Sequence, residues 1–328
     1  MKKLYTAFAF LGLLFATPVL AHVKWFVDSE AVSDVLHGLV PFYAITSNEV
    51  IIWTIIAVIG VYVCKKFDDM IKVPKKLEAY AHKHEKTIIR IAQAIFGLFL
   101  VTVTLLWNII LVPEFPIENM FTSALGYIQI LAGLLYIANY KPHYASYLVL
   151  LLYIALGLTH GLMPLFENLI LISLALYFAI KSGHAHPTLK HLEPRALEIV
   201  RIATGVSLIV LAFTEKLMYP ELSMIFLNNH QWNFMHAIFP WFTDTLFILS
   251  TGFAECIFGI IFILGYNTRI NTLIIAGFFS VSVVSMAISS HAWEVEDLVV
   301  YSAAILFLFF GNGGLHLVRK LKLTKTQA

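Results

Sequence analysis

Glu255 is the residue whose position most directly suggests chemistry, because it lies near the middle of an apolar stretch at 243–265. A carboxylate at the centre of a bilayer costs about 2.5–3.5 kcal/mol, so we expect it to face other helices, to be protonated or to pair with a base. Lys216 is the candidate base, and Glu215 beside it is an alternative partner for that lysine. These three residues are the candidates for catalytic groups.

Gln129 lies at a similar depth in an earlier apolar stretch, 120–139, where its amide can form hydrogen bonds without carrying charge. Polar side chains at such positions often join two membrane helices, with a contribution of about 1 kcal/mol. The sequence therefore leaves two interpretations of Glu255 open. It is either a polar clamp between helices or a group that handles a proton or a ligand.

Histidines recur in the segments that we expect to lie outside the membrane. Neutral imidazole and carboxylate groups bind zinc, copper and iron, and an N-terminal histidine can bind copper through its amine and its ring. The spacing matches no familiar metalloenzyme motif, so hydrogen-bonded or solvated histidines are the alternative. The candidate metal ligands are His22, His160, His230, His236, His291 and Glu296.

The segment between Pro220 and Phe242 combines tryptophan, phenylalanine and amide side chains. Aromatic residues of this kind anchor helices at the headgroup level of a membrane, which predicts an interfacial helix. The alternative is a lid over a pocket for a quinone or another small molecule. Trp232 and Trp241, together with Gln129, are the candidates for binding such a cofactor.

The composition indicates which elements must hold these residues. Of 328 residues, 59% are apolar and 13% are charged, and the mean hydropathy is +0.82, whereas soluble domains contain roughly 25% charged residues. The longer apolar stretches can cross a hydrocarbon layer of ~30 Å at ~1.5 Å per residue. We therefore predict an all-α polytopic membrane protein in a lipid bilayer. The stretches are 50–64, 88–112, 120–139, 145–160, 165–180, 197–214, 243–265, 270–289 and 297–311.

Several classes of function are disfavoured. The net charge of +2 gives no reason to expect a nucleic-acid partner. The sequence has no nucleotide-binding loop, serine-hydrolase elbow or zinc-protease motif, which argues against a hydrolase or an ATP-driven pump. Its two cysteines, Cys64 and Cys256, are too far apart in the predicted layout to pair.

Residues 1–21 have the features of a secretory signal, with Lys2 and Lys3 ahead of an apolar stretch that ends at Ala21. Cleavage there would make His22 the N-terminus, and the alternative is a retained membrane helix. Apart from those two lysines, only Lys24 and Lys216 of the 22 Lys and Arg residues fall in segments assigned to the outside. The positive-inside rule then puts the mature N-terminus outside and the C-terminus in the cytoplasm of a bacterial-type inner membrane.

An internal repeat relates two parts of the chain. Residues 108–115 align with 215–222, and residues 126–133 align with 252–259, which places Gln129 over Glu255. Each copy is expected to cross the membrane an even number of times, so the two copies share one orientation. The repeat is therefore parallel rather than inverted.

The second copy carries the motifs Arg201-Ile-Ala-Thr-Gly205, Glu215-Lys216-Leu-x-x-Pro220, Gly252-x-x-Glu255-x-x-x-Gly259 and Gly265-Tyr-x-x-Arg269. In these motifs, residues 195–314 resemble the DoxX family of four-helix membrane proteins. The first copy lacks the Glu-Lys pair and the arginine corner, so it is interpreted as a diverged copy. The resemblance implies compact four-helix bundles and an association with membrane redox systems, including quinol-oxidising complexes, but it transfers no known active site.

The sequence thus predicts one N-terminal transmembrane helix followed by two tandem DoxX-like four-helix bundles. We expect a subunit or accessory of a quinone-linked membrane redox system, with other redox subunits as partners. The alternatives are a copper-binding protein of the outer face and a small-solute or proton-coupled transporter. The predicted segments are a signal peptide (1–21), an outer segment (22–45), a transmembrane helix (46–66), a cytoplasmic linker (67–85), the first four-helix unit (86–183), a second linker (184–194), the second unit (195–314) and a cytoplasmic tail (315–328).

Overall fold

The computed structural model of the chain describes residues 24, 47–68, 70, 73–183, 187–230, 233–289 and 297–313. These residues form helices and no β-strand, apart from one isolated bridge between Ile109 and Pro116. The all-α fold class is therefore confirmed for this part of the chain. The predicted signal peptide, the predicted new N-terminus at His22 and the cytoplasmic tail lie outside the described residues.

The helices follow the apolar stretches closely. Long apolar residues such as leucine, isoleucine and phenylalanine favour helix in a membrane, where every backbone polar group must be bonded within its own segment. In chain order the elements are α3 (Asn48–Asp68), α4 (Lys75–Lys83), α5 (Glu85–Trp107), α6 (Met120–Ile137), α7 (Pro142–His160), α8 (Met163–Glu167), α9 (Leu169–Lys181), α10 (Pro187–Lys190), η2 (Glu193–Arg195), α11 (Ala196–Ala212), η3 (Phe213–Leu217), α12 (Pro220–His230), α13 (Phe234–Ile238), α14 (Asp244–Leu264), α15 (Thr268–Ser289) and α16 (Asp297–Phe310).

Among the described residues, 6 helices are long and apolar enough to cross a membrane. They are α3, α5, α6, α7, the continuous helix Glu193–Leu217 and α14. The shorter apolar helices α9 and α16 have 13 and 14 residues, fewer than the ~20 that a straight span needs. This content is what a polytopic membrane protein requires.

Two predicted spans differ from the observed helices. The stretch 88–112 extends past the end of α5, because Asn108 adopts the left-handed conformation with φ 54° and stops the helix. The stretch 165–180 is divided into α8 and α9 at Asn168, whose φ of −117° and ψ of 29° are not helical. Hydropathy predicted neither break, because both stretches remain apolar on average across these positions.

The described chain divides into two compact units. The first contains residues 47–63, 208–259 and 274–289, and the second contains 64–207, 260–273 and 297–313. Residues 195–314, predicted to be the second copy of the repeat, contribute to both units. The boundaries drawn from the repeat stay predictions.

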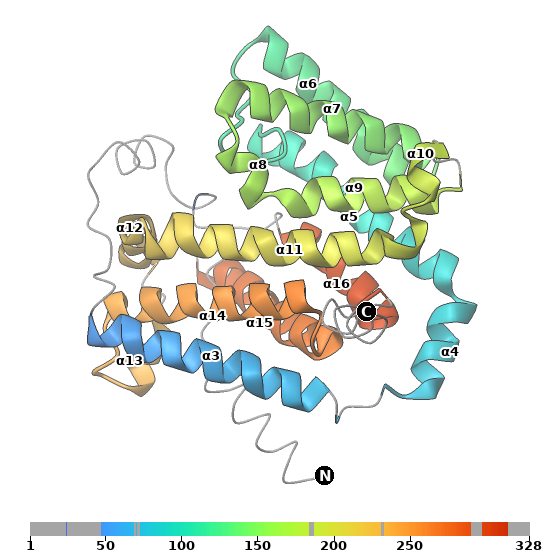
Figure 1. Cartoon of the computed structure of the whole chain (residues 1–328). Helices are drawn as coiled ribbons and strands as arrows, with labels where there is room; N and C mark the ends of the chain where they lie inside the picture. Colours follow the sequence, from blue (N-terminus) through green and yellow to red (C-terminus); the bar gives the residue numbers. More distant parts are fainter. Residues whose placement is uncertain are drawn as a thin grey trace. The chain divides into compact units, whose positions relative to one another are not determined.

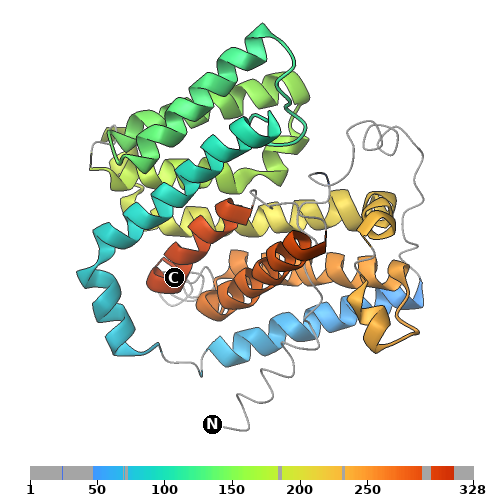
Figure 2. The ribbon, with the colours of Figure 1, turned by 180° about the vertical axis from the view of Figure 1, so that it is seen from behind.

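In the second unit, α5 packs on α6, α6 on α7 and α7 on α9, and the two views show these helices side by side (Figures 1 and 2). Helix α16 also packs on α5, and Ser302 donates a hydrogen bond to the carbonyl of Ala92 at 2.8 Å. Close approach of α5 and α6 depends on glycine: a Cβ added at Gly97 would lie 2.6 Å from the carbonyl oxygen of Gly133. Small residues at such crossings are typical of membrane helices.

The first unit holds η3, α12 and α13, together with most of α3, α14 and α15. One buried apolar cluster joins α12 to α14, and its members are Leu222, Phe226, Leu227, Phe242, Phe247 and Ile248. A second cluster joins the end of α11 and η3 to α14, with Val50 and Trp53 of α3 packed against it. The stretch between Pro220 and Phe242, predicted as one interfacial helix, contains the two helices α12 and α13.

Candidate functional site: a buried Glu-Lys-Glu cluster

The site begins with a change of helix type at the end of α11. Residues Phe213–Leu217 form a π-helix, in which the amide of Met218 donates to the carbonyl of Phe213, five residues back, at 2.7 Å. Such widened turns occur mostly as single turns within α-helices and often at functional sites. This turn carries Glu215 and Lys216, and all of Thr214, Glu215, Lys216 and Leu217 are buried.

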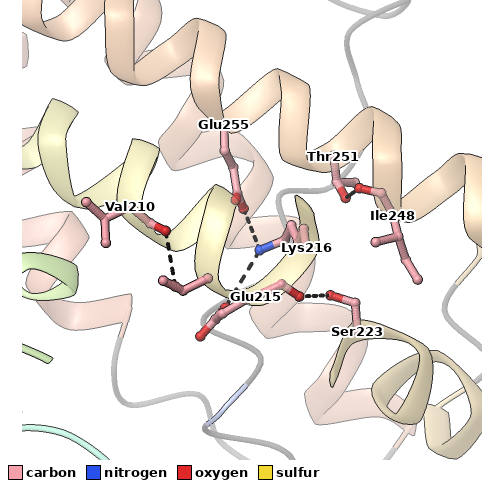
Figure 3. A network of polar contacts seen from close by, with 8 residues as sticks. Val210, Glu215, Lys216, Ser223, Ile248, Thr251 and Glu255 are labelled. Carbon is pink, nitrogen blue, oxygen red and sulfur yellow. Dashed lines mark hydrogen bonds and ion pairs between the residues drawn. The ribbon is translucent and has the colours of Figure 1, made fainter. Parts of the chain in front are cut away.

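Lys216 lies between two carboxylates (Figure 3). Its Nζ is 3.0 Å from Oε1 of Glu255 and 3.7 Å from Oε2 of Glu215. The side chains of Glu215, Lys216 and Glu255 are 0%, 1% and 2% exposed. We call these three residues the buried triad. The sequence left open which carboxylate the lysine contacts, and the structure shows that it contacts both.

Neighbouring residues bring η3 and α14 close together. A Cβ added at Gly252 would lie 2.8 Å from Cδ2 of Leu217 and 3.2 Å from Cβ of Lys216, so a larger residue there would displace the Leu217 side chain. Because Gly252 and Glu255 are three residues apart, they lie on the same face of α14. The glycine that permits the contact and the carboxylate that makes it therefore face the same turn of η3.

The buried triad combines two carboxylates with one ammonium, which sum to a formal charge of −1 for these three residues when every group is ionised. Burying charges is costly unless they are paired and hydrogen-bonded. Lys216 pairs with both carboxylates, so the triad is an ion-pair cluster buried in the helix bundle.

Gln129 makes a different set of contacts in the second unit. Its side-chain oxygen accepts a hydrogen bond from the amide of Leu111 at 2.9 Å, and its nitrogen donates to the carbonyls of Leu100 and Ile109 at 3.2 and 3.3 Å. The side chain is 0% exposed. The three partners are backbone groups of α5 and of the loop that follows it, so Gln129 acts as a structural clamp between them.

Gln129 and Glu255, which correspond in the repeat alignment, contact corresponding segments of the chain. Gln129 contacts the backbone of Ile109, and Glu255 contacts the side chain of Lys216, the residue that aligns with Ile109. In both cases a polar residue of the following long helix reaches the irregular segment where the preceding helix ends. Only the Glu255 pair carries charge.

Two arginines that sequence reasoning used only as motif residues have structural roles in the second unit. Arg201 is 0% exposed, and its guanidinium donates to the carbonyls of Phe262, Ile263 and Asn312. Arg269 donates to the carbonyls of Leu308 and Phe309 at 2.9 and 3.0 Å. Both arginines thus satisfy carbonyls at the C-terminal ends of helices, where a positive charge is favourable.

Each of these arginines lies close to a glycine. A Cβ at Gly265, whose φ is +79°, would lie 2.9 Å from Arg201. A Cβ at Gly311, with φ +73°, would lie 3.0 Å from Arg269. A pairing of buried arginine with glycine at a helix end is the signal that could have identified these contacts from the sequence.

The described part of the chain does not assemble a metal site from the candidate ligands that it contains. Among the residues that the structure describes, no group of three or more His, Cys, Asp or Glu side chains could hold a metal ion. His160 is exposed, with Nδ1 2.7 Å from the hydroxyl of Thr159, and His236 is also exposed. His22, His291 and Glu296 lie outside the described residues, as does the side chain of His230.

The candidate cofactor residue Trp241 lies at the surface. Trp241 is 66% exposed and its ring contacts Phe239 and Phe242, at 5.6 Å between centroids in each case. This is the arrangement expected of an aromatic anchor at a membrane interface. Trp232 lies outside the described residues.

Comparison of the chain with protein-family models, with curated proteins and with solved structures finds no match.

Proposed function

We propose that this chain is an integral membrane protein that serves a quinone-linked redox system, and that the buried triad accepts a proton during that reaction. One observation carries the proposal: two carboxylates, Glu215 and Glu255, both contact the Lys216 ammonium in a fully buried site. A lysine that only joins two helices needs one carboxylate. A second buried carboxylate beside it is a group that can take up a proton.

Quinol oxidation supplies a reason for such a site. A quinol that becomes a quinone releases two electrons and two protons, and the electrons pass to a redox partner subunit. The protons need acceptors within the membrane. Glu255 is suited to take up one of them, because carboxyl groups buried inside membrane helix bundles can serve as proton relays.

We further propose that the chain contains two tandem DoxX-like four-helix units in a bacterial-type inner membrane. In support, residues of the quoted motifs contact one another: Lys216 contacts Glu255 and Gly252, and Arg201 lies against Gly265. The sequential packing of α5, α6, α7 and α9 is also what a four-helix unit requires. The orientation proposed from the positive-inside rule puts the C-terminus in the cytoplasm.

Proton-coupled solute transport is a second candidate that the same triad favours. A carboxylate that binds and releases a proton within a bundle can couple proton movement to another solute. The two candidates differ in what accompanies the proton: a quinol and a redox partner in one case, a solute and no electron transfer in the other.

The first test asks what the chain binds. The full-length protein is purified in mild detergent, its bound lipids are extracted with organic solvent, and quinones are identified by chromatography. Mass spectrometry of the same preparation identifies co-purified proteins. We expect a quinone and at least one redox subunit. A preparation that contains neither, combined with proton-driven solute uptake in vesicles, would favour the transporter instead.

The second test asks whether the triad takes up a proton. Infrared difference spectra between neutral and acidic pH report carboxyl groups that become protonated. We expect a buried-carboxyl band that is lost in Glu255→Gln and retained in Glu49→Gln, which makes the same change at an exposed residue of α3. If the band persists in Glu255→Gln, the triad is not the proton acceptor.

A further inference from the structure

The carbonyl of Glu215 occupies an unusual position in the backbone. In a π-helix, the residue five positions ahead donates to each carbonyl, as Met218 does to Phe213. For Glu215, that residue is Pro220. Proline has no N–H, so the backbone cannot provide this hydrogen bond. The carbonyl of a charged triad member therefore needs a donor from elsewhere.

Ser223 provides this donor. Its hydroxyl, from the first turn of α12, donates to the carbonyl oxygen of Glu215 at 2.9 Å (Figure 3). The Ser223 side chain is 0% exposed, so water is excluded as a replacement. Helix α12 packs directly on η3. The hydrogen bond thus fixes the π-helical turn against the helix that follows it.

We infer that Ser223 is a positioning residue for the buried triad: through the carbonyl of Glu215 it holds the turn that directs Lys216 toward Glu255. This inference rests on the proposed role of the triad as a proton acceptor. Lys216 directly follows the Glu215 carbonyl that Ser223 bonds, and its ammonium lies 3.0 Å from Oε1 of Glu255. Rotation of this peptide moves the start of the lysine side chain and weakens that contact.

The segment between Pro220 and Phe242 thereby also supports the buried triad. Ser223 lies between Leu222 and the other α12 residues that pack in a buried cluster with Phe247 and Ile248 of α14. The cluster fixes α12, and α12 fixes the η3 turn through Ser223. The segment therefore does more than anchor the protein at an interface.

The test uses the infrared band that the Glu255→Gln variant identifies as the triad carboxyl. In Ser223→Ala the ammonium is held less firmly near Glu255, so we expect the band to reach half its height about one pH unit higher. Ser250→Ala is the matched control: Ser250 is also 0% exposed and donates at 2.9 Å, but to Phe247 of its own helix. It should leave the midpoint unchanged.

Two rescue variants separate positioning from general stability. Ser223→Thr keeps the hydroxyl and should restore the midpoint. In Pro220→Ala combined with Ser223→Ala, the new backbone N–H at position 220 can bond the Glu215 carbonyl, and we expect partial restoration. This second rescue remains informative if Ser223→Ala alone does not fold.

The outcomes distinguish the two proposals. A band that persists in Glu255→Gln overturns the proton-acceptor role, and with it the role of Ser223 in proton uptake. A band that is lost in Glu255→Gln but has the same midpoint in Ser223→Ala as in Ser250→Ala overturns the role of Ser223 alone. An equal shift in both serine variants also overturns it, because the effect would then follow from the loss of any buried hydroxyl.

Discussion

Replacing Lys216 with methionine should destabilise the protein far more than replacing Glu255 with glutamine. At an effective dielectric constant of about 20, Coulomb's law gives roughly 5.5 kcal/mol for the 3.0 Å pair and roughly 4.5 kcal/mol for the 3.7 Å pair. Desolvation of the ions offsets much of this attraction. Lys216→Met removes both contacts and takes from two buried carboxylates the ammonium that both of them contact.

The expected loss for Lys216→Met is about 3–5 kcal/mol, the usual cost of removing one partner from a buried ion pair. In Glu255→Gln the amide oxygen still accepts a hydrogen bond from Lys216, and Glu215 still balances the ammonium. We therefore expect a loss of only about 1 kcal/mol for that change. The double variant, Lys216→Met with Glu255→Gln, should be more stable than Lys216→Met alone, because it replaces one of the two buried carboxylates with a neutral amide.

The free energy of unfolding can be measured on purified protein in mild detergent by titration with a denaturing detergent, with circular dichroism reporting helix content. Lys76→Met is the control, because Lys76 is exposed in α4 and its loss should change stability by no more than about 0.5 kcal/mol. If Lys216→Met differs from Glu255→Gln by less than about 0.5 kcal/mol, the triad behaves like a solvated surface pair and the reasoning is refuted.

Further predictions concern the residues around the triad and the rest of the fold. Gln129→Glu should be less stable than wild type by about 2 kcal/mol in the same unfolding assay, because a carboxylate cannot donate to the two backbone carbonyls that the amide bonds; wild-type stability would contradict the clamp. Gly252→Ala should destabilise by about 1–3 kcal/mol because its Cβ meets Leu217 at 2.8 Å, whereas Gly277→Ala, with nothing within 4 Å of the new Cβ, should not. Arg201→Ala should cost about 3 kcal/mol by leaving helix-end carbonyls without donors, and a neutral effect would show that those carbonyls find other partners. Intact-mass analysis of protein purified from membranes should give a chain that begins at His22, and a mass that includes Met1 would exclude cleavage of the signal.

Part of the site could be predicted from the sequence, because hydropathy is a local property. A single carboxylate within an apolar stretch identified Glu255, and the shortage of cations outside the cytoplasm made Lys216 its candidate partner. The repeat alignment placed Gln129 at the corresponding position. Each of these inferences depends only on residue type and on spacing along one helix.

Residue type and spacing could not show which of the candidate residues are buried together and which are exposed. Trp241 and His236 were chosen because aromatic and imidazole groups can bind cofactors and metals, but both are exposed and belong to no cluster of metal ligands among the described residues. Ser223 and Arg201 attracted no functional interpretation, since an isolated serine or a motif arginine has no signal of its own. Their roles depend on carbonyl groups contributed by other segments.

The sequence by itself determined the all-helical class, the placement of most apolar helices and the choice of Glu255 as the central residue, since burial of apolar residues in lipid needs no knowledge of neighbours. Only the tertiary structure decided that Lys216 contacts both carboxylates, that the turn carrying it is a π-helix, and that Ser223 replaces the donor that Pro220 lacks. These features arise where the ends of different helices meet. Their geometry is set by packing between segments, which spacing along the chain does not specify.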